Sequence, residues 1–313
     1  MSNILNLDFL NNLALAAVRM ATPLLLVALA ELYSERVGLV NIGLDGLMTI
    51  GACGAFLGGY ITGNPYIGLL IGALAGIAVN MIFAFSTITL CAVQTVQGMA
   101  LNILAPALAT YMYRGYFGVD TTLKSGKTIS NLSIPILKDI PILGYALGRC
   151  SPVTYMAIAI LLITVFFFKK TRIGLNYRSV GDFPQACDTM GINVIRYKYI
   201  GCVICGALSG LGGAFLVTCY ISSYSNGVVG GRGFIALAAV IFGGWHPVGI
   251  LLATLFFGFI DGLQLRMQLI YPGIPYQFFS MLPYFCTLVT LAFLGKRHLG
   301  PKSVGKEYIR GAK

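Results

Sequence analysis

Charged side chains are scarce in this sequence. Asp, Glu, Lys and Arg together make up 10% of its 313 residues, whereas hydrophobic residues make up 57%. A soluble globular domain carries about 25% charged residues, so the scarcity excludes an ordinary soluble domain. Several apolar runs reach about 20 residues, the length that crosses roughly 30 Å of hydrocarbon as a helix. These runs are continuous and do not alternate with a period of two, which disfavours a β-barrel.

The residues that usually carry out catalysis are also few. His246 and His298 are the only histidines, and no Ser/His/Asp arrangement or metal-ligand spacing appears. Cys202 and Cys205 form a C-x-x-C, but on a predicted membrane helix and without a second pair, so we interpret them as core residues. The "SGKT" at 125–128 lacks the glycine that a P-loop places at position 121, where Thr stands. The sequence therefore predicts no catalytic residue, no metal site and no cofactor; it does not predict an enzyme.

A cleaved signal peptide is not expected either, because the N-terminus lacks its basic, apolar and small-residue pattern. The net charge of +11 is concentrated beside predicted spans, with six Lys/Arg in 169–198 and six in 296–313. This placement is typical of the positive-inside rule and not of a nucleic-acid-binding surface. We therefore expect 171–199 and the tail 296–313 to be cytoplasmic and the loop 117–152 to be extracytoplasmic. Five Lys/Arg in 114–152 are a contrary signal.

We predict an all-α polytopic membrane helical bundle of about 8–10 transmembrane helices, forming a single transmembrane domain over residues 1–313. The candidate spans are 10–33, 38–62, 66–90, 98–116, 153–169, 198–222, 233–244, 248–266 and 276–294.

Two of these segments are short and interrupted by glycine: "NIGLDGLMTIGA" (41–52) and "FIALAAVIFGG" (234–244). Aligned on Ile42 and Ile235, they indicate an internal repeat, and a pair of broken helices in two halves points to a transport site. Irregular backbone at membrane depth must face protein or a water-lined cavity, as must an intramembrane carboxylate. We therefore predict that Asn41 and Asp45 lie beside a translocation pathway. The alternative is that the glycines only allow close helix packing.

Other polar residues within or beside the predicted spans are further candidates for the pathway, since a neutral amphiphilic solute needs amides and flat apolar faces. The alternatives are an interfacial loop for the first three and a polar contact between helices for the last two. We interpret Arg36 and Arg232, which precede the broken segments, as membrane-interface anchors. The candidates are Gln94, Gln97, Asn102, Asp261 and Gln264.

Three long segments resemble the simple-sugar and nucleoside branch of ABC importer permeases, a group related to the branched-chain amino-acid permeases. They are "ERVGLVNIGLDGLMTIGA" (35–52), "TRIGLNYRSVGDFPQACDTMGINV" (171–194) and "GRGFIALAAVIFGGWHPVGILLATLFFGFIDGLQLRMQ" (231–268). The third segment is closer to the nucleoside members. The resemblance implies a multi-pass permease of the bacterial inner membrane that imports nucleosides by alternating access. It also implies partners: an ATP-binding cassette ATPase subunit that uses the ATP, a second homologous permease, an extracytoplasmic substrate-binding lipoprotein and the surrounding lipids.

Within the second segment, "QACDTMG" (185–191) has the layout of the EAA-type signature, which in that group forms a short cytoplasmic helix that docks on the ATPase. Gln185 stands where the signature has Glu, and Cys187 stands where it has Ala, so the salt bridge of that Glu is in doubt. The resemblance assigns the coupling loop to Arg178, Gly181, Gln185, Ala186 and Gly191.

Alternatives remain open at this point. Within the class, the chain would be a simple-sugar or branched-chain amino-acid permease. Outside it, an ion-coupled secondary transporter would share the broken helices and the buried Asp45.

Overall fold

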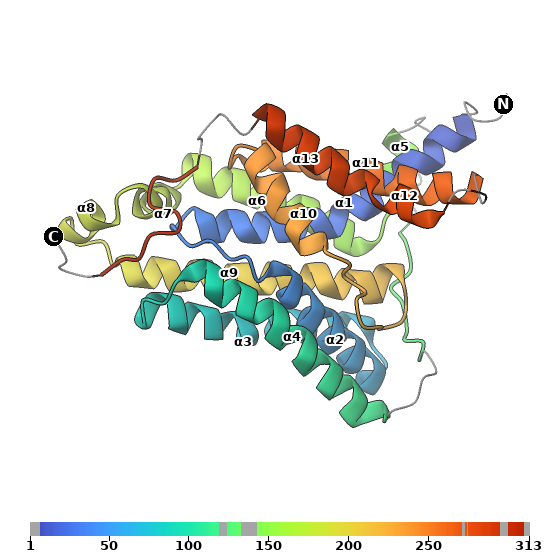
Figure 1. The fold of residues 1–313 in the computed structure, drawn as a ribbon, viewed down its shortest axis with the longest axis horizontal. Coiled ribbons are helices and arrows are strands. Elements are labelled where there is room, and N and C mark those ends of the chain that lie inside the picture. The colour runs from blue at the N-terminus through green and yellow to red at the C-terminus, as the bar shows by residue number, and fades with distance from the viewer. Residues whose placement is uncertain are drawn as a thin grey trace.

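A computed structural model describes residues 7–118, 124–132, 143–270, 273, 275–294 and 300–309, and its described part is built from helices. The expected all-α bundle is confirmed, and so are the approximate positions of the spans (Figure 1). The elements are α1 (Leu7–Glu35), α2 (Leu44–Thr62), α3 (Pro65–Ala84) with a π-helical end (Phe85–Thr89), α4 (Gln94–Phe117), α5 (Leu143–Leu147), α6 (Pro152–Lys170), α7 (Arg172–Asp182), α8 (Pro184–Thr189), α9 (Val194–Phe215) with a π-helical end (Leu216–Tyr220), α10 (Arg232–Phe242), α11 (Pro247–Ile270), α12 (Tyr276–Ser280) and α13 (Leu282–Leu294).

Six helices of the described part are long and apolar enough to cross a membrane, and two shorter apolar helices accompany them. The predicted span 38–62 is interrupted, because regular helix begins only at Leu44. Residues 36–43, which we call the first connector, join α1 to α2 without helix. Residues 221–231 join α9 to α10 in the same way and form the second connector. The first predicted break is therefore present within its segment 41–52, whereas residues 234–242 are continuous helix and the second break lies before that segment.

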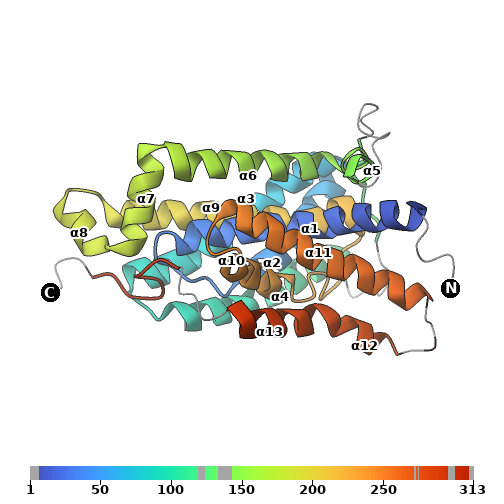
Figure 2. The same ribbon diagram turned by 90° about the horizontal axis from the view of Figure 1, so that it is seen from above.

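The molecule has two ends, which are visible in Figures 1 and 2. The end that carries α7, α8 and residues 300–309 is called the α8 end here. The start of α1 lies at the opposite end, which also carries α5 and is called the α5 end. Residues 171–199 and the described part of the tail thus share one end, while residues 143–151 lie at the other.

The helices form two sets of similar arrangement, and the first helix of one set runs opposite to the first helix of the other. In Figure 1 α1 runs toward the α8 end and α9 runs toward the α5 end. The packing partners correspond: α1 packs against α11 as α9 packs against α3, and α1 packs against α10 as α9 packs against α2. Likewise α2 contacts α4, and α10 contacts α13. Matching α1–α4 with α9, α10, α11 and α13 gives an inverted repeat of the kind found in transporters.

Small residues bring α2, α3 and α9 close together. A Cβ atom added to Gly76 of α3 would lie 2.9 Å from the Cα of Gly210 on α9. One added to Gly72 would lie 2.7 Å from the carbonyl oxygen of Gly51 on α2. Side chains of any size are excluded here, as is common where helices associate within membranes. These close approaches pack α2, α3 and α9 into a tight three-helix interface.

Candidate functional site

The centre of the molecule contains the point where α2 and α10 begin, and the two helix N-termini meet there. The backbone N–H of Gly233 donates to Oδ1 of Asp45 at 3.2 Å. A Cβ atom on Gly233 would lie 2.6 Å from the Cα of Asp45, so only glycine allows this approach. A helix N-terminus has unpaired N–H groups and a partial positive charge. Asp45 lies in the first turn of α2 and also faces the start of α10, so it interacts with two such ends.

A single arginine connects this meeting point to α11. Arg232 is the first residue of α10, and its Nε lies 3.9 Å from Oδ2 of Asp261. Its Nη1 donates to the carbonyl oxygen of Val229 at 3.0 Å, which holds the second connector against the helix start. The Nε atom is buried and has no hydrogen-bond partner in the structure. The polar cluster at the break therefore holds two carboxylates and a guanidinium that retains an unused donor. We call Asp45, Arg232, Gly233 and Asp261 the break cluster.

Asn102 of α4 fixes the other side of the break. Its Oδ1 accepts from the N–H of Gly46 at 2.8 Å, and its Nδ2 donates to the carbonyl oxygen of Ile42 at 2.9 Å. The amide thus bridges the last turn of the first connector and the first turn of α2. Because Gly46 lies at the start of α2, one of the unpaired N–H groups of that helix is satisfied by a side chain from another helix.

Asn41 lies in a fully buried hydrogen-bond network, not beside open space. Its backbone N–H donates to Oε1 of Glu31 at 2.9 Å, and its Nδ2 donates to Oδ1 of Asn80 at 2.8 Å. Asn80 in turn donates to the carbonyl oxygen of Cys202 at 2.6 Å. These bonds anchor the first connector to α1, α3 and α9. Asn41 stays a prediction as a solute contact, and in this conformation it is closed off from solvent.

The remaining pathway candidates lie apart from the break cluster. Gln94 is 3% exposed; its Oε1 accepts from the N–H of Val40 at 2.8 Å and its Nε2 donates to the carbonyl oxygen of Lys306 at 3.3 Å. Gln264 donates to Oγ of Ser280 at 3.4 Å, toward α12, while Gln97 is half-buried on α4. The structure therefore brings together Asp45, Asp261 and Asn102, but not the three glutamines.

Sequence reasoning missed two important residues. Arg232 was interpreted as an interface anchor, whereas its guanidinium pairs with Asp261 inside the bundle. Glu31 was not singled out, although it is fully buried on a long apolar helix. A signal for Glu31 existed, because an ionisable residue within a predicted span is a candidate functional residue by default. No comparable signal distinguished Arg232, since arginine beside a short apolar helix also fits an anchor.

The predicted coupling residues lie at the α8 end, within the short helix α8 and on both sides of it. Gln185, Ala186 and Gly191 are exposed. Gly181 is buried instead, because a Cβ atom there would lie 2.8 Å from the backbone carbon of Arg36. Arg178 lines a cavity of about 360 Å³ together with Arg36. Burial lowers the pKa of Arg36 from its ordinary value, and the charge of Arg178 lowers it further.

The segment "SGKT" belongs to the described residues 124–132, which contain no helix. The N–H of Gly126 donates to the carbonyl oxygen of Ser222 at 2.8 Å, and Ser125 forms an isolated β-bridge with Ser223. The segment therefore lies against the second connector.

A family described as "Branched-chain amino acid transport system / permease component" matches residues 13–291. The guanosine ABC transporter permease protein NupQ of Bacillus subtilis is 41% identical over 93% of this chain and 94% of its own length. The nucleoside ABC transporter permease protein NupC of Lactococcus lactis is 37% identical over the same shares. A Haloferax volcanii protein, TsgC13, provisionally named as a glucose ABC transporter permease, is 35% identical over 84% of this chain and 79% of its own length.

Proposed function

The chain belongs to the family of branched-chain amino acid transport system permease components, and on that premise we propose that it is the membrane-spanning subunit of an ABC importer for nucleosides. The match to two relatives named for guanosine and nucleoside transport, each over 93% of this chain, supports nucleosides as the cargo. The six apolar helices and the inverted repeat support a subunit that spans the bilayer. We propose the bacterial inner membrane as its location, which the Bacillus subtilis and Lactococcus lactis relatives support.

The meeting of α2 and α10 at Asp45 and Gly233 is the observation that carries the transport mechanism. The hydrogen bond from Gly233 to Asp45 joins α10 to α2, and these two half-helices can separate without unwinding a continuous helix; the Arg232–Asp261 pair links α10 to α11. When they separate, Asp45, Arg232 and Asp261 would face the gap as acceptors and a donor. A nucleoside is neutral and carries hydroxyls and a polar base edge, so weak hydrogen bonding of this kind lets it pass without being held.

We further propose that the ATPase subunit docks on α7 and α8 and supplies the energy. Phe183 and Met190 support this, since they flank α8 and expose 57% and 81% of their surface, respectively. Large exposed apolar side chains beside a polar helix are typical of an interaction site. A second, homologous permease and an extracytoplasmic substrate-binding lipoprotein complete the proposed assembly, with the receptor on the α5 end.

Competition uptake in cells tests the proposed cargo. Cells that express the chain with its partners should accumulate labelled guanosine, and unlabelled nucleosides should compete, whereas glucose and leucine should not. The second candidate cargo is a simple sugar, which the TsgC13 relative favours. Competition by glucose but not by nucleosides would replace the proposed cargo with that one.

A further inference from the structure

Residues 300–309 form a segment at the α8 end that binds the end of α7, immediately before α8. The N–H of Ser303 donates to the carbonyl oxygen of Gly181 at 3.0 Å, and its hydroxyl donates to the same oxygen. The N–H of Lys302 donates to Oδ1 of Asp182 at 3.3 Å, and its ammonium lies 4.7 Å from the centre of the Phe183 ring. We call α7, α8 and the turn after α8 (residues 172–193) the docking region. Two neighbouring residues of the tail, Lys302 and Ser303, therefore contact three consecutive residues of this region, 181–183.

The same segment also binds the first connector. The N–H of Gly305 donates to the carbonyl oxygen of Gly38 at 3.3 Å. Gly38 has a φ of +84°, and a Cβ atom there would lie 2.8 Å from Oγ of Ser303. The carbonyl oxygen of Lys306 accepts from Gln94, whose other amide atom accepts from Val40. Ser303 is thus enclosed between α7 and the connector, and it is 8% exposed.

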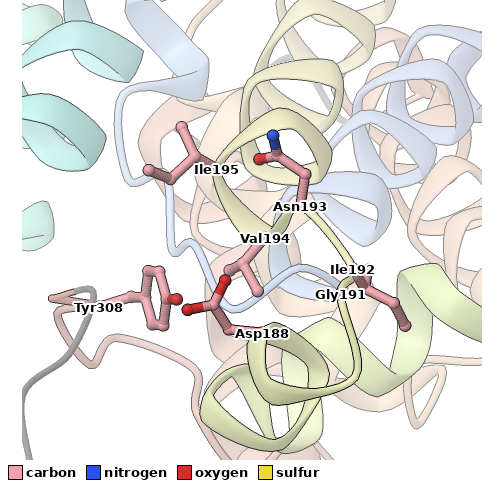
Figure 3. A pocket seen from close by; sticks show the side chains of 7 residues that line it. All are labelled: Asp188, Gly191, Ile192, Asn193, Val194, Ile195 and Tyr308. Atoms are coloured by element: carbon pink, nitrogen blue, oxygen red, sulfur yellow. The ribbon is translucent and has the colours of Figure 1, made fainter.

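The segment continues to the turn between α8 and α9. Tyr308 lines a cavity of about 150 Å³ together with Asp188, Gly191 and Asn193. Figure 3 shows the Tyr308 hydroxyl and the Asp188 carboxylate directed toward each other across this cavity. The Lys198 ammonium lies 5.6 Å from the centre of the Tyr308 ring. Residues 300–309 therefore contact the docking region on both sides of α8.

The other half of the inverted repeat contains an equivalent contact. Residues 124–132 follow α4, as residues 300–309 follow α13, and they bind the second connector at the α5 end. The N–H of Gly126 donates to the carbonyl oxygen of Ser222 in that connector, and the N–H of Ile129 donates to the carbonyl oxygen of Thr218, in the π-helical end of α9 just before it, at 2.9 Å. In both halves, the segment after the last helix of one repeat binds the connector of the other repeat. This correspondence argues that the contact belongs to the architecture of the fold.

We propose that residues 300–309 are a coupling strap, which passes movement of α7 and α8 to the first connector and so to Asp45, with Ser303 as its positioning residue. The inference rests on the proposed function. The first connector ends two residues before Asp45, and the strap holds its beginning. A displacement of α8 therefore moves the strap, the strap moves Gly38, and the connector carries the start of α2.

The test measures solute transported per ATP hydrolysed, in proteoliposomes that contain the complete complex. Ser303→Leu introduces a side chain that the enclosed site cannot hold, so the strap should leave its site. A chain that ends before Gly300 removes the strap without adding bulk. In both variants the complex should assemble, basal ATP hydrolysis should persist, and transport per ATP should fall at least about fivefold, the lower range of site-to-site coupling.

Glu307→Leu is the matched control, because it adds the same residue at an exposed position of the same strap. A chain that ends after Ile309 controls for truncation. Both should keep the wild-type ratio. An unchanged ratio in S303L and in the chain that ends before Gly300 would overturn the proposal, and so would an equal fall in E307L. Failure of both S303L and that shortened chain to assemble with the partners would also overturn it. Failure of the proposed function gives a different result, because the wild-type complex would then hydrolyse ATP without moving nucleosides. The strap can still be tested in that case with any other solute that the complex transports, since only the ratio of solute transported to ATP hydrolysed is compared.

Discussion

At the residue scale, the break cluster explains how this chain keeps carboxylates inside a membrane protein. A charged residue at the centre of a bilayer costs about 2.5–3.5 kcal/mol on insertion scales. Asp45 offsets this cost with an N–H of α10 and with the partial positive charge of two helix ends. Asp261 is stabilised by Arg232. The same groups that stabilise the closed break become available to a solute when the break opens.

Substitution of Asp45 tests this electrostatic account. Asp45→Asn keeps an oxygen acceptor for Gly233 and should retain uptake within about threefold. Asp45→Lys places a positive charge at two helix ends that are themselves partly positive. Repulsion from each end costs up to about 2 kcal/mol, so uptake should fall at least tenfold. Uptake is normalised to the amount of folded protein from size-exclusion chromatography. Normal transport by both variants would show that the site is peripheral.

The close approach at Gly233 gives a second prediction. Gly233→Ala places a methyl group within 2.6 Å of the Cα of Asp45, and overpacking of this kind costs about 1–3 kcal/mol. Thermal unfolding in detergent should therefore begin at a lower temperature, and uptake should fall. Gly115→Ala is the control, because nothing lies within 4 Å of a Cβ atom there. Equal melting temperatures for the two variants would contradict the tight contact.

At the element scale, sequence periodicity predicted most of the helices but not how they connect. The broken segments were recognisable because glycine, an amide and a lone carboxylate interrupt an apolar run. The repeat alignment was displaced: Ile42 was matched to Ile235, whereas the helix starts at Leu44 and Arg232 correspond with a shift of five residues. Apolar strings align in several registers, and only the packing of α2 and α10 selects one. The strap could not be predicted, since its bonds involve mainly backbone atoms.

The turn after α8 depends on a glycine with left-handed backbone, and this gives a testable prediction. Gly191 has a φ of +81°, and a Cβ atom there would meet nothing within 4 Å. Gly191→Val is therefore opposed by backbone strain of about 1–2 kcal/mol and not by a clash. It should lower uptake while ATP hydrolysis continues.

Gly191→Asn is the control, because Asn adopts the left-handed conformation at lower cost. It should transport nearly as well as the wild type. Full transport by Gly191→Val would refute a coupling role for this turn.

At the scale of the whole molecule, two inverted sets of helices place one break cluster at their centre and one connector toward each end. The fold class and the first break followed from composition and pattern. The site was predicted only in part: Asp45, Asn102 and Asp261 meet at the break, while Asn41 and Gln94 hold its connector. Hydrogen-bond partners on other helices separate these two groups, and these partners become neighbours only when the helices pack.

The central claim is that opening of this break is driven by ATP hydrolysis on a partner subunit. Its most direct test is guanosine uptake into proteoliposomes that contain the chain, the second permease, the receptor and the ATPase, the last either wild-type or with the P-loop lysine replaced. The account predicts uptake with the wild-type ATPase even when ion gradients are collapsed, and none with the disabled ATPase. Uptake by the chain without a working ATPase, following an ion gradient, would contradict it.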